Sequence, residues 1–318
     1  MTPRNFDVVC VGNAKIDTFL TLHEANDHLR FAEDSNELCI KFGEKVTVDK
    51  TEILLGGNAA NVAVGISRLG LNAGLIAEIG DDEFAQKIIN SLSQEKVDTS
   101  NIKSVAGQQS SFSTIINFKG ERTIFSEHVK RPHDFAFENI TTKWVYLTSL
   151  GEEWKNAYEK TLDFVSKTNA LLAFNPGTLQ ISAGLTSIKN VLQITEVLFV
   201  NKEEGEALLM INDKEVTIND LLNKLKELGP KIVVITDGEN GSFAIDANGI
   251  VSKKEIIETQ VIEKTGAGDA YSSGFLSGLI NDKPISDCMD WGTKNSASVI
   301  GKVGAQAGLL HKNGLEEK

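Results

Sequence analysis

The sequence predicts an α/β protein whose central sheet is mostly parallel and doubly wound, with helices on both faces and a small β lid. Short β-branched runs alternate along the chain with amphipathic stretches of helical period, which is the pattern of repeated strand–helix units. Polar clusters follow several predicted strands, and two polar stretches of alternating hydrophobicity interrupt the pattern. The length of 318 residues fits one domain of this class with insertions, spanning residues 1–318.

The first half of the chain begins the alternation. Phe6–Val11 is a β-branched, apolar run that we expect to form a buried first strand. The stretch from Leu54 to Gly70 opens with two glycines and continues as a helix that Asn58 can cap. Ala73–Ile79 is predicted as a strand and Asp82–Leu92 as an amphipathic helix.

The second half continues it. Strands are predicted at Trp144–Leu147, Leu171–Phe174, Val197–Val200 and Lys231–Ile235, followed by a hairpin of Phe243–Ile245 and Ile250–Ser252. Helices are predicted at Glu152–Ser166, from Asn201 through Leu209, at Leu221–Leu228, after Gly268, and at Pro284–Ile300. Ligands of doubly wound sheets bind beyond the carboxyl ends of the strands. Polar residues that follow strands should therefore share one rim, and these are Asn13, Asn175, Asn201 and Thr236.

Two insertions, at about 14–50 and 107–126, are predicted to form the lid. Lys45–Val48 has the composition of a strand, and Thr18–Leu22 is a second candidate. Ser110–Phe118 and Arg122–Phe125 alternate polar and apolar residues, which is typical of an antiparallel hairpin with one covered face. Such a sheet leaves open edges that proteins usually cover. We therefore predict a homodimer in which two lids clasp.

Composition excludes several classes of protein. A net charge of −12 and a pI near 5.0 argue against binding nucleic acid or a membrane surface. No apolar stretch approaches the ~20 residues that span a bilayer, and no secretory signal is apparent. The expectation is a reduced, cytoplasmic protein. Neither cysteines nor histidines have metal-ligand spacing, and we expect the histidines at the surface or in the lid: His23, His28, His128, His133 and His311.

One stretch, KTGAGDAYSSGFL from Lys264 to Leu276, carries the strongest chemical signal. Two glycines lead into an apolar helix, and a helix N-terminus offers free N–H groups and positive potential to an anion. Asp269 lies where such an anion would bind. It could simply cap the helix. Alternatively, it takes a proton from a hydroxyl while the N–H groups hold charge on a phosphoryl group.

The chain as a whole resembles the ribokinase-like, PfkB-type family of carbohydrate and nucleoside kinases. Gly56–Gly57–Asn58 through Asn61 is similar to the family's N-terminal signature, and Lys264–Asp269 to its specific C-terminal signature. Asn201–Glu204 resembles the N-x-x-E element, and Thr236–Gly241 the nucleotide-binding turn. The resemblance covers nearly all of the chain and implies a ribokinase-like fold.

The resemblance also implies roles for individual residues. Asp269 would be the general base for ATP-dependent phosphorylation of a hydroxymethyl group, and Gly266, Ala267 and Gly268 would form the anion hole. The sugar would be bound by Asn13, Asp17, Gly57, Asn58 and Asn61. The nucleotide would be bound by Asn201, Thr236, Gly238, Gly241 and Thr293. Glu204 would organise Mg²⁺ largely through water, since magnesium dehydrates reluctantly.

Three positions depart from the family pattern. Glu263 stands where many members have Asp, which makes activation by K⁺ doubtful. Thr293 falls where many members carry Asn near the adenine. Gly301–Lys302 replaces a common Thr–Arg pair.

The charge of the substrate is predicted from the motifs. Asp17 and Asp269 flank the proposed pocket without Lys or Arg in these motifs, so a neutral polyhydroxylated substrate is expected. A free sugar is the first choice and an adenosine- or inosine-type nucleoside the alternative. A sugar phosphate would need a cation from the lid region, with four candidates: Lys119, Arg122, Lys130 and Arg131. A non-catalytic sugar-binding protein is a further alternative, against which the intact Asp269 motif argues.

Overall fold

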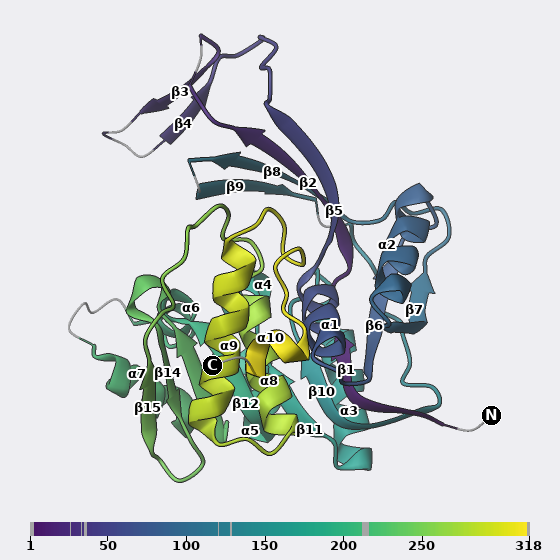
Figure 1. The fold of residues 1–318 in the computed structure, drawn as a ribbon. Helices are drawn as coiled ribbons and strands as arrows, with labels where there is room; N and C mark the ends of the chain where they lie inside the picture. Colours follow the sequence, from purple (N-terminus) through teal and green to yellow (C-terminus); the bar gives the residue numbers. More distant parts are fainter. Residues whose placement is uncertain are drawn as a thin grey trace.

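A computed structural model describes residues 3–25, 27–32, 34, 37–119, 121–127, 129–211 and 216–316. Within these ranges, a nine-stranded sheet forms the centre, in the order β15-β14-β13-β12-β11-β10-β1-β6-β7 (Figure 1). Its strands are β1 (Arg4–Val11), β6 (Ala73–Ile79), β7 (Asp98–Ser104), β10 (Ile140–Leu147), β11 (Leu171–Phe174), β12 (Thr195–Asn201), β13 (Ile232–Thr236), β14 (Ser242–Ile245) and β15 (Val251–Lys254). Neighbours from β13 to β7 run parallel, and β14 and β15 are antiparallel at one edge.

Helices cover both faces of this sheet. Alternate residues of β1 enter opposite cores, Val8 and Cys10 on one face and Val9 and Val11 on the other, because side chains alternate along a strand. The first face carries α1 (Asn58–Arg68), α2 (Glu83–Gln94), α8 (Ala267–Ile280) and α9 (Ile285–Ile300). The second carries α3 (Trp154–Thr168), α5 (Leu185–Ile194), α6 (Lys202–Leu208) and α7 (Ile218–Glu227). The doubly wound, mostly parallel sheet predicted from sequence is therefore confirmed.

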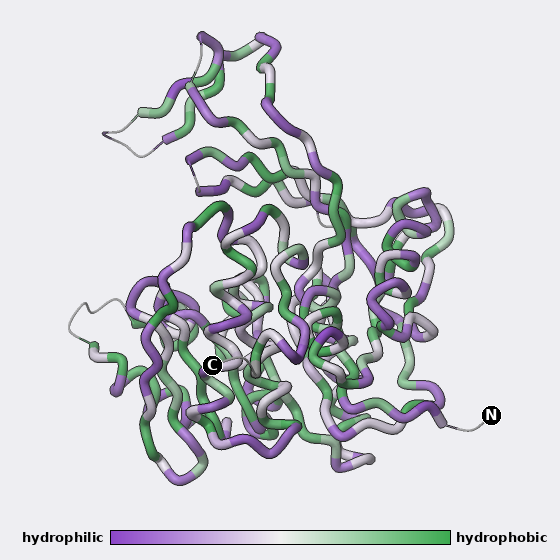
Figure 2. Tube along the Cα trace, viewed as in Figure 1, coloured by the Kyte–Doolittle hydropathy of each residue, from purple (hydrophilic) through white to green (hydrophobic). Residues whose placement is uncertain are grey.

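Hydrophobic residues run along the strands of the large sheet, and hydrophilic ones dominate the outer loops (Figure 2). Two short helices, α4 (Thr178–Ser182) and α10 (Lys312–Glu316), complete the α-helices of the described residues. None of the described helices is both long enough and apolar enough to cross a bilayer.

A second sheet, in the order β5-β2-β8-β9, stands over one end of the large sheet (Figure 1). Its strands are β2 (Lys15–Leu22), β5 (Lys50–Gly56), β8 (Phe112–Phe118) and β9 (Glu121–Ser126). At its far tip, β3 (Leu29–Ala32) pairs with β4 (Glu37–Ile40). Leu22, Leu29 and Phe118 form a small core under this tip. We call the four strands and the tip hairpin the lid.

The strand predicted at Lys45–Val48 is wrong. These residues form no strand, and the strand that pairs with β2 is β5, which begins at Lys50. Val46 and Val48 instead pack against the small core of the tip. The alternation of apolar residues at 45–48 therefore reflects partial burial of the two valines and not strand formation.

Candidate active site

The start of α8 has the form of an anion-binding turn. Gly266 caps the helix with φ +79°, and a Cβ there would lie 2.4 Å from that of Ala305, so only glycine fits. The amides of Gly268 and Asp269 open the first turn, where no preceding turn supplies carbonyl partners. The space in front of the Gly268 Cα is open, because a Cβ built there would meet nothing within 4 Å apart from its chain neighbours and the backbone of α8 itself. The turn can therefore admit a ligand close to its N–H groups.

Asp269 lies in the first turn of α8 with 9% of its surface exposed. Its Oδ2 accepts a hydrogen bond of 2.8 Å from Asn61 Nδ2. Burial raises the pKa of Asp269 to about 7, the nearby charges of Glu204 and Asp17 add to the rise, and Asn61 and Lys15 oppose it. The N-cap interpretation of Asp269 is wrong, because Gly266 is the cap and no side chain bonds to it. A carboxylate with a pKa near neutral suits a general base.

The turn between β5 and α1 brings the backbone close to the lid strand β2. A Cβ on Gly56 would lie 1.9 Å from Asp17 Oδ2, and one on Gly57 would lie 2.4 Å from the carbonyl oxygen of Asn13. Gly57, with φ +96°, is the N-cap of α1, and Asn58 is the first helical residue. The prediction that Asn58 caps this helix is therefore wrong. The two glycines allow Asp17 and Asn13 to approach the start of α1.

Asp17 is buried, with 3% of its surface exposed, and its Oδ1 has no hydrogen-bond partner among the described residues. Burial raises the pKa of Asp17, and the charge of Lys15 lowers it. Lys15 Nζ lies 3.7 Å from Asp17 Oδ1 and donates to Ser113 Oγ at 2.7 Å. Lys15 was not predicted as a site residue from the sequence. Its position two residues before Asp17 on a strand was the available signal, since such residues share a face.

Asn201 and Glu204 form the N-terminal cap of α6. Asn201 Oδ1 accepts from the amide of Glu204 at 2.7 Å, and Glu204 Oε2 accepts from the amide of Asn201 at 2.9 Å, which is a capping box. Burial raises the pKa of Glu204. Asn201 is also the register partner of Thr236 on β13. Both lie at the carboxyl end of the sheet, so these two predicted nucleotide residues are neighbours.

The turn after β13 is shaped by Gly238 at φ +49° and Gly241 at φ +84°, and a Cβ on Gly241 would lie 2.2 Å from the carbonyl oxygen of Lys254. Lys202 Nζ lies 3.9 Å from Asp237 Oδ2, which connects α6 to this turn. Thr293 is buried on α9, a helix that packs against β14 and β15.

No group of three or more His, Cys, Asp or Glu side chains that could hold a metal is found among the described residues. Magnesium bound with a nucleotide needs only one or two carboxylates, because phosphate and water supply the other ligands. The half-buried Glu204, whose charge raises the pKa of Asp269, fits that requirement.

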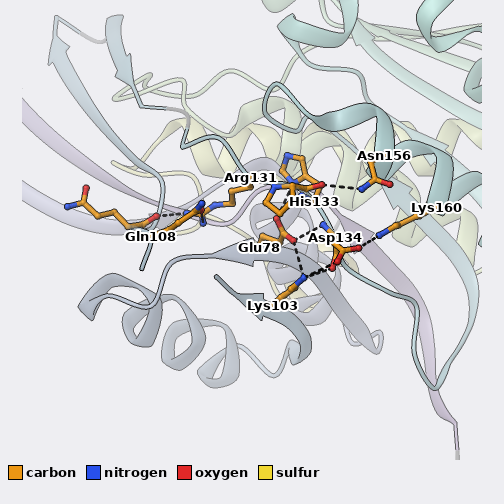
Figure 3. Close-up of polar contacts among 10 residues, drawn as sticks. Glu78, Lys103, Gln108, Arg131, His133, Asp134, Asn156 and Lys160 are labelled. Carbon is orange, nitrogen blue, oxygen red and sulfur yellow. Dashed lines mark hydrogen bonds and ion pairs between the residues drawn. The ribbon is translucent and has the colours of Figure 1, made fainter. Parts of the chain in front are cut away.

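Arg131 and Glu78 bind the chain segments that connect the lid to the large sheet (Figure 3). Arg131 donates to Gln108 Oε1 at 2.9 Å and to the carbonyl oxygen of Gln109 at 2.5 Å, so it connects the segment after β9 to the one before β8. Glu78, on β6, accepts from the amides of His133 and Asp134, each at 2.8 Å. Arg131 is thus engaged within the protein.

His133 contradicts the expectation of a surface or lid histidine, since only 3% of its surface is exposed. Burial and the charge of Arg131 lower its pKa to about 4, so its imidazole is neutral at pH 7. His128 lies outside the described residues.

The lid contacts the loop that precedes α8. Lys264 is ion-paired with Glu121 on β9, and Asn117 Nδ2 on β8 lies 3.5 Å from the carbonyl oxygen of Ile262. Of the lid-region cations, Lys119 lies over the rings of Phe31 and Phe118, and Lys130 pairs with Glu153.

Residues 7–313 match the model of the pfkB family of carbohydrate kinases. The chain belongs to this family. It is a phosphotransferase with an alcohol group as acceptor, and membership in a kinase family implies the use of ATP.

Relatives in the family have different substrates. A 5-dehydro-2-deoxygluconokinase from Geobacillus kaustophilus is 26% identical, over 84% of this chain and 84% of its own. Two solved structures share the fold. Arabidopsis thaliana ribokinase complexed with ribose and ATP has a TM-score of 0.77 and 19% identity, and covers 99% of this chain and 98% of its own. Methanocaldococcus jannaschii nucleoside kinase has a TM-score of 0.78 and 22% identity, with the same coverage.

Proposed function

We propose that this kinase phosphorylates a hydroxymethyl group of a small sugar, with Asp269 as the general base and the turn of Gly266, Ala267 and Gly268 as the anion hole. The observation that carries the proposal is a carboxylate with a pKa near 7 directly beside an open helix N-terminus. Phosphoryl transfer depends mainly on positioning and on stabilising charge. Both functions are provided within one turn of α8.

The step is proton removal coupled to displacement at phosphorus. Asp269 accepts the hydroxyl proton of the sugar while the sugar oxygen bonds to the γ-phosphorus of ATP and the bond to the β-phosphate oxygen breaks. The amides at the start of α8 stabilise charge on the transferred group. Glu204 would hold magnesium through water, and the metal would neutralise charge on the phosphate oxygens when bound. Thr236, Gly238, Gly241, Asn201 and Thr293 are proposed for the nucleotide.

The sugar is proposed to lie between Asp17 and Asp269. Asp17 Oδ1, which accepts no hydrogen bond from the described residues, is an acceptor for a sugar hydroxyl, since a buried polar atom without a hydrogen bond is costly. The turn at Gly57 and Asn58, with Asn13 against it, would contact the same ligand. Lys15 places a cation 3.7 Å from Asp17 Oδ1, so the proposed sugar site contains a positive charge beside its two carboxylates. A neutral sugar remains our first choice, and a nucleoside is the alternative.

A coupled ADP-release assay over pentoses, hexoses, sugar acids, sugar phosphates and nucleosides tests this function. We expect sugar-dependent ADP release with a neutral sugar as the best substrate. A sugar acid as the best substrate would identify Lys15 as the group that reads the carboxylate, and Lys15→Met should then abolish the preference. Ligand binding without ADP release across the whole panel would contradict the kinase proposal and favour a binding protein.

A further inference from the structure

Asn61 was predicted to contact the sugar, but both ends of its side-chain amide are already used inside the protein. Its Nδ2 donates to Asp269 Oδ2 at 2.8 Å, and its Oδ1 accepts from Gln306 Nε2 at 2.9 Å. Only 3% of the surface of Asn61 is exposed. The three side chains form a line from a loop near the C-terminus, through α1, to the start of α8.

We propose that Gln306 is a positioning residue that fixes the orientation of the Asn61 amide and thereby holds the Asp269 carboxylate for proton transfer. The inference rests on the proposed function, because it assigns Asp269 the role of base. Gln306 lies outside all of the sequence motifs that contain the predicted site residues.

The direction of the amide is what Gln306 controls. An asparagine side chain presents donors on one side and an acceptor on the other. With Gln306 donating to Oδ1, the NH₂ group must face Asp269. If the Asn61 amide rotated by half a turn, its Oδ1 would face the Asp269 carboxylate and its NH₂ group would face the NH₂ group of Gln306. Without the Gln306 donor, the bond to Asp269 would be the one side-chain hydrogen bond of Asn61 among the described residues that opposes this rotation.

Gln306 is itself held by the helix that carries Asn61. Arg68, at the end of α1, donates from Nη1 to the carbonyl oxygens of Gln306 and Leu309 at 2.7 and 3.0 Å. Glu95 fixes the Arg68 guanidinium through two further bonds, of 2.8 and 2.7 Å. Arg68 follows Asn61 by seven residues, about two turns, so both project from one side of α1. The loop and the base are therefore tied to the same rigid element.

This line of hydrogen bonds opposes the effect of burial on Asp269. Donation from Asn61 lowers the pKa of Asp269, whereas burial, the largest influence, raises it. Loss of a donor to the charged form raises a carboxyl pKa. Removing Gln306 should therefore raise the pKa of Asp269 and reduce the fraction of active base at neutral pH.

The test uses Gln306→Met, which keeps length without a donor, and Gln306→Glu, which replaces the donor by an acceptor. Lys302→Met, at an exposed position of the same loop, is the matched control. The Asp269 pKa is measured in the full-length protein by carboxyl ¹³C NMR titration, with the signal assigned by its loss in Asp269→Asn. We expect both Gln306 variants to raise this pKa, by roughly one unit for Met and further for Glu, and Lys302→Met to leave it unchanged.

Kinetics supply the second readout. The acid limb of kcat/KM against pH should move up with the NMR value, so that Gln306→Met loses about tenfold at pH 6 and little at pH 9. Combined with Asn61→Leu, the same change should add no further shift, because the two act through one path. An unshifted Asp269 titration in folded Gln306 variants overturns the inference. The inference is also overturned if Gln306→Met lowers kcat/KM at pH 6 as much in the Asn61→Leu protein as in the native protein.

The NMR readout separates this inference from the proposed function. A shifted Asp269 titration in a chain that phosphorylates nothing in the substrate panel would leave the positioning role intact and reject the kinase chemistry. An unshifted Asp269 titration in Gln306 variants of an active kinase would reject the positioning role and leave the proposed function intact.

Discussion

At the scale of single residues, the site combines one strongly buried acid with hydrogen bonds that keep it usable. Burial favours the neutral form of Asp269, and the charges of Glu204 and Asp17 act in the same direction. Asn61 and Lys15 oppose them. The result is a carboxylate with a pKa of about 7, which is half ionised at neutral pH. The proposed chemistry therefore predicts activity that falls as the pH drops below 7.

The same shift predicts how stability depends on pH. The pKa of Asp269 is about 7 in the folded chain against 3.8 for a free side chain, so between these values the folded state binds more protons than the unfolded one. The free energy of unfolding should then decrease as the pH rises from 4 to 7. Asp269→Asn removes this cost and should raise the melting temperature at pH 8, with little change at pH 4. Thermal denaturation at the two pH values checks this, and equal shifts at both would contradict it.

Individual site residues could be predicted from the sequence where they belong to a short local motif. The glycines before Asp269 and the pair Gly56–Gly57 are visible as motifs, and the structure gives each a steric reason. The partners of Asp269 were not predictable in this way. Asn61 and Gln306 lie 208 and 245 residues apart from their partners Asp269 and Asn61, and no local pattern reports such a contact.

At the level of secondary-structure elements, a substitution in the first turn of α8 should have opposite effects on stability and on catalysis. Alanine at Gly268 meets open space and φ there is not positive, so Gly268→Ala should fold normally and stabilise the helix by about 0.5–1 kcal/mol. Its methyl group would occupy the place proposed for the phosphoryl group, so kcat should fall at least tenfold. Melting curves and steady-state rates measure both effects.

Gly56→Ala provides the contrasting case at the β5–α1 turn. Its Cβ would lie 1.9 Å from Asp17 Oδ2, so Asp17 must move and the KM for the sugar should rise more than that for ATP. Unchanged KM values in Gly56→Ala would contradict the placement of the sugar beside Asp17.

The strand–helix order was predictable because its signal is periodic and local. The strands β1, β6 and β13 are rich in apolar residues that face both sides of the sheet, as parallel strands covered on both faces should be, and Val8–Val11 of β1 is a continuous apolar run. The edge strand β7 was missed because its sequence, DTSNIKS, has little β-propensity. It is recruited by pairing with β6. Tertiary pairing overrode local preference at this edge.

At the scale of the whole molecule, the lid raises the question of assembly. Register places Ile53, Thr18, Thr114 and Phe125 in one row across the lid. Ile53 and Phe125 are 44% and 57% exposed. We expect a second copy to cover this face, giving a homodimer in light scattering at micromolar concentration. Phe125→Asp should yield a monomer. A native chain that is already monomeric would reject the lid-to-lid dimer.

In the proposed mechanism, Asp269 removes the proton of the acceptor hydroxyl. The most direct measurement is single-turnover phosphorylation by Asp269→Asn, using the best substrate of the panel and saturating ATP. Loss of a general base costs on the order of 10²–10⁴-fold, so we predict a rate reduced by that factor with nucleotide affinity nearly unchanged. Near-native turnover by a correctly folded Asp269→Asn protein would show that Asp269 is not the base.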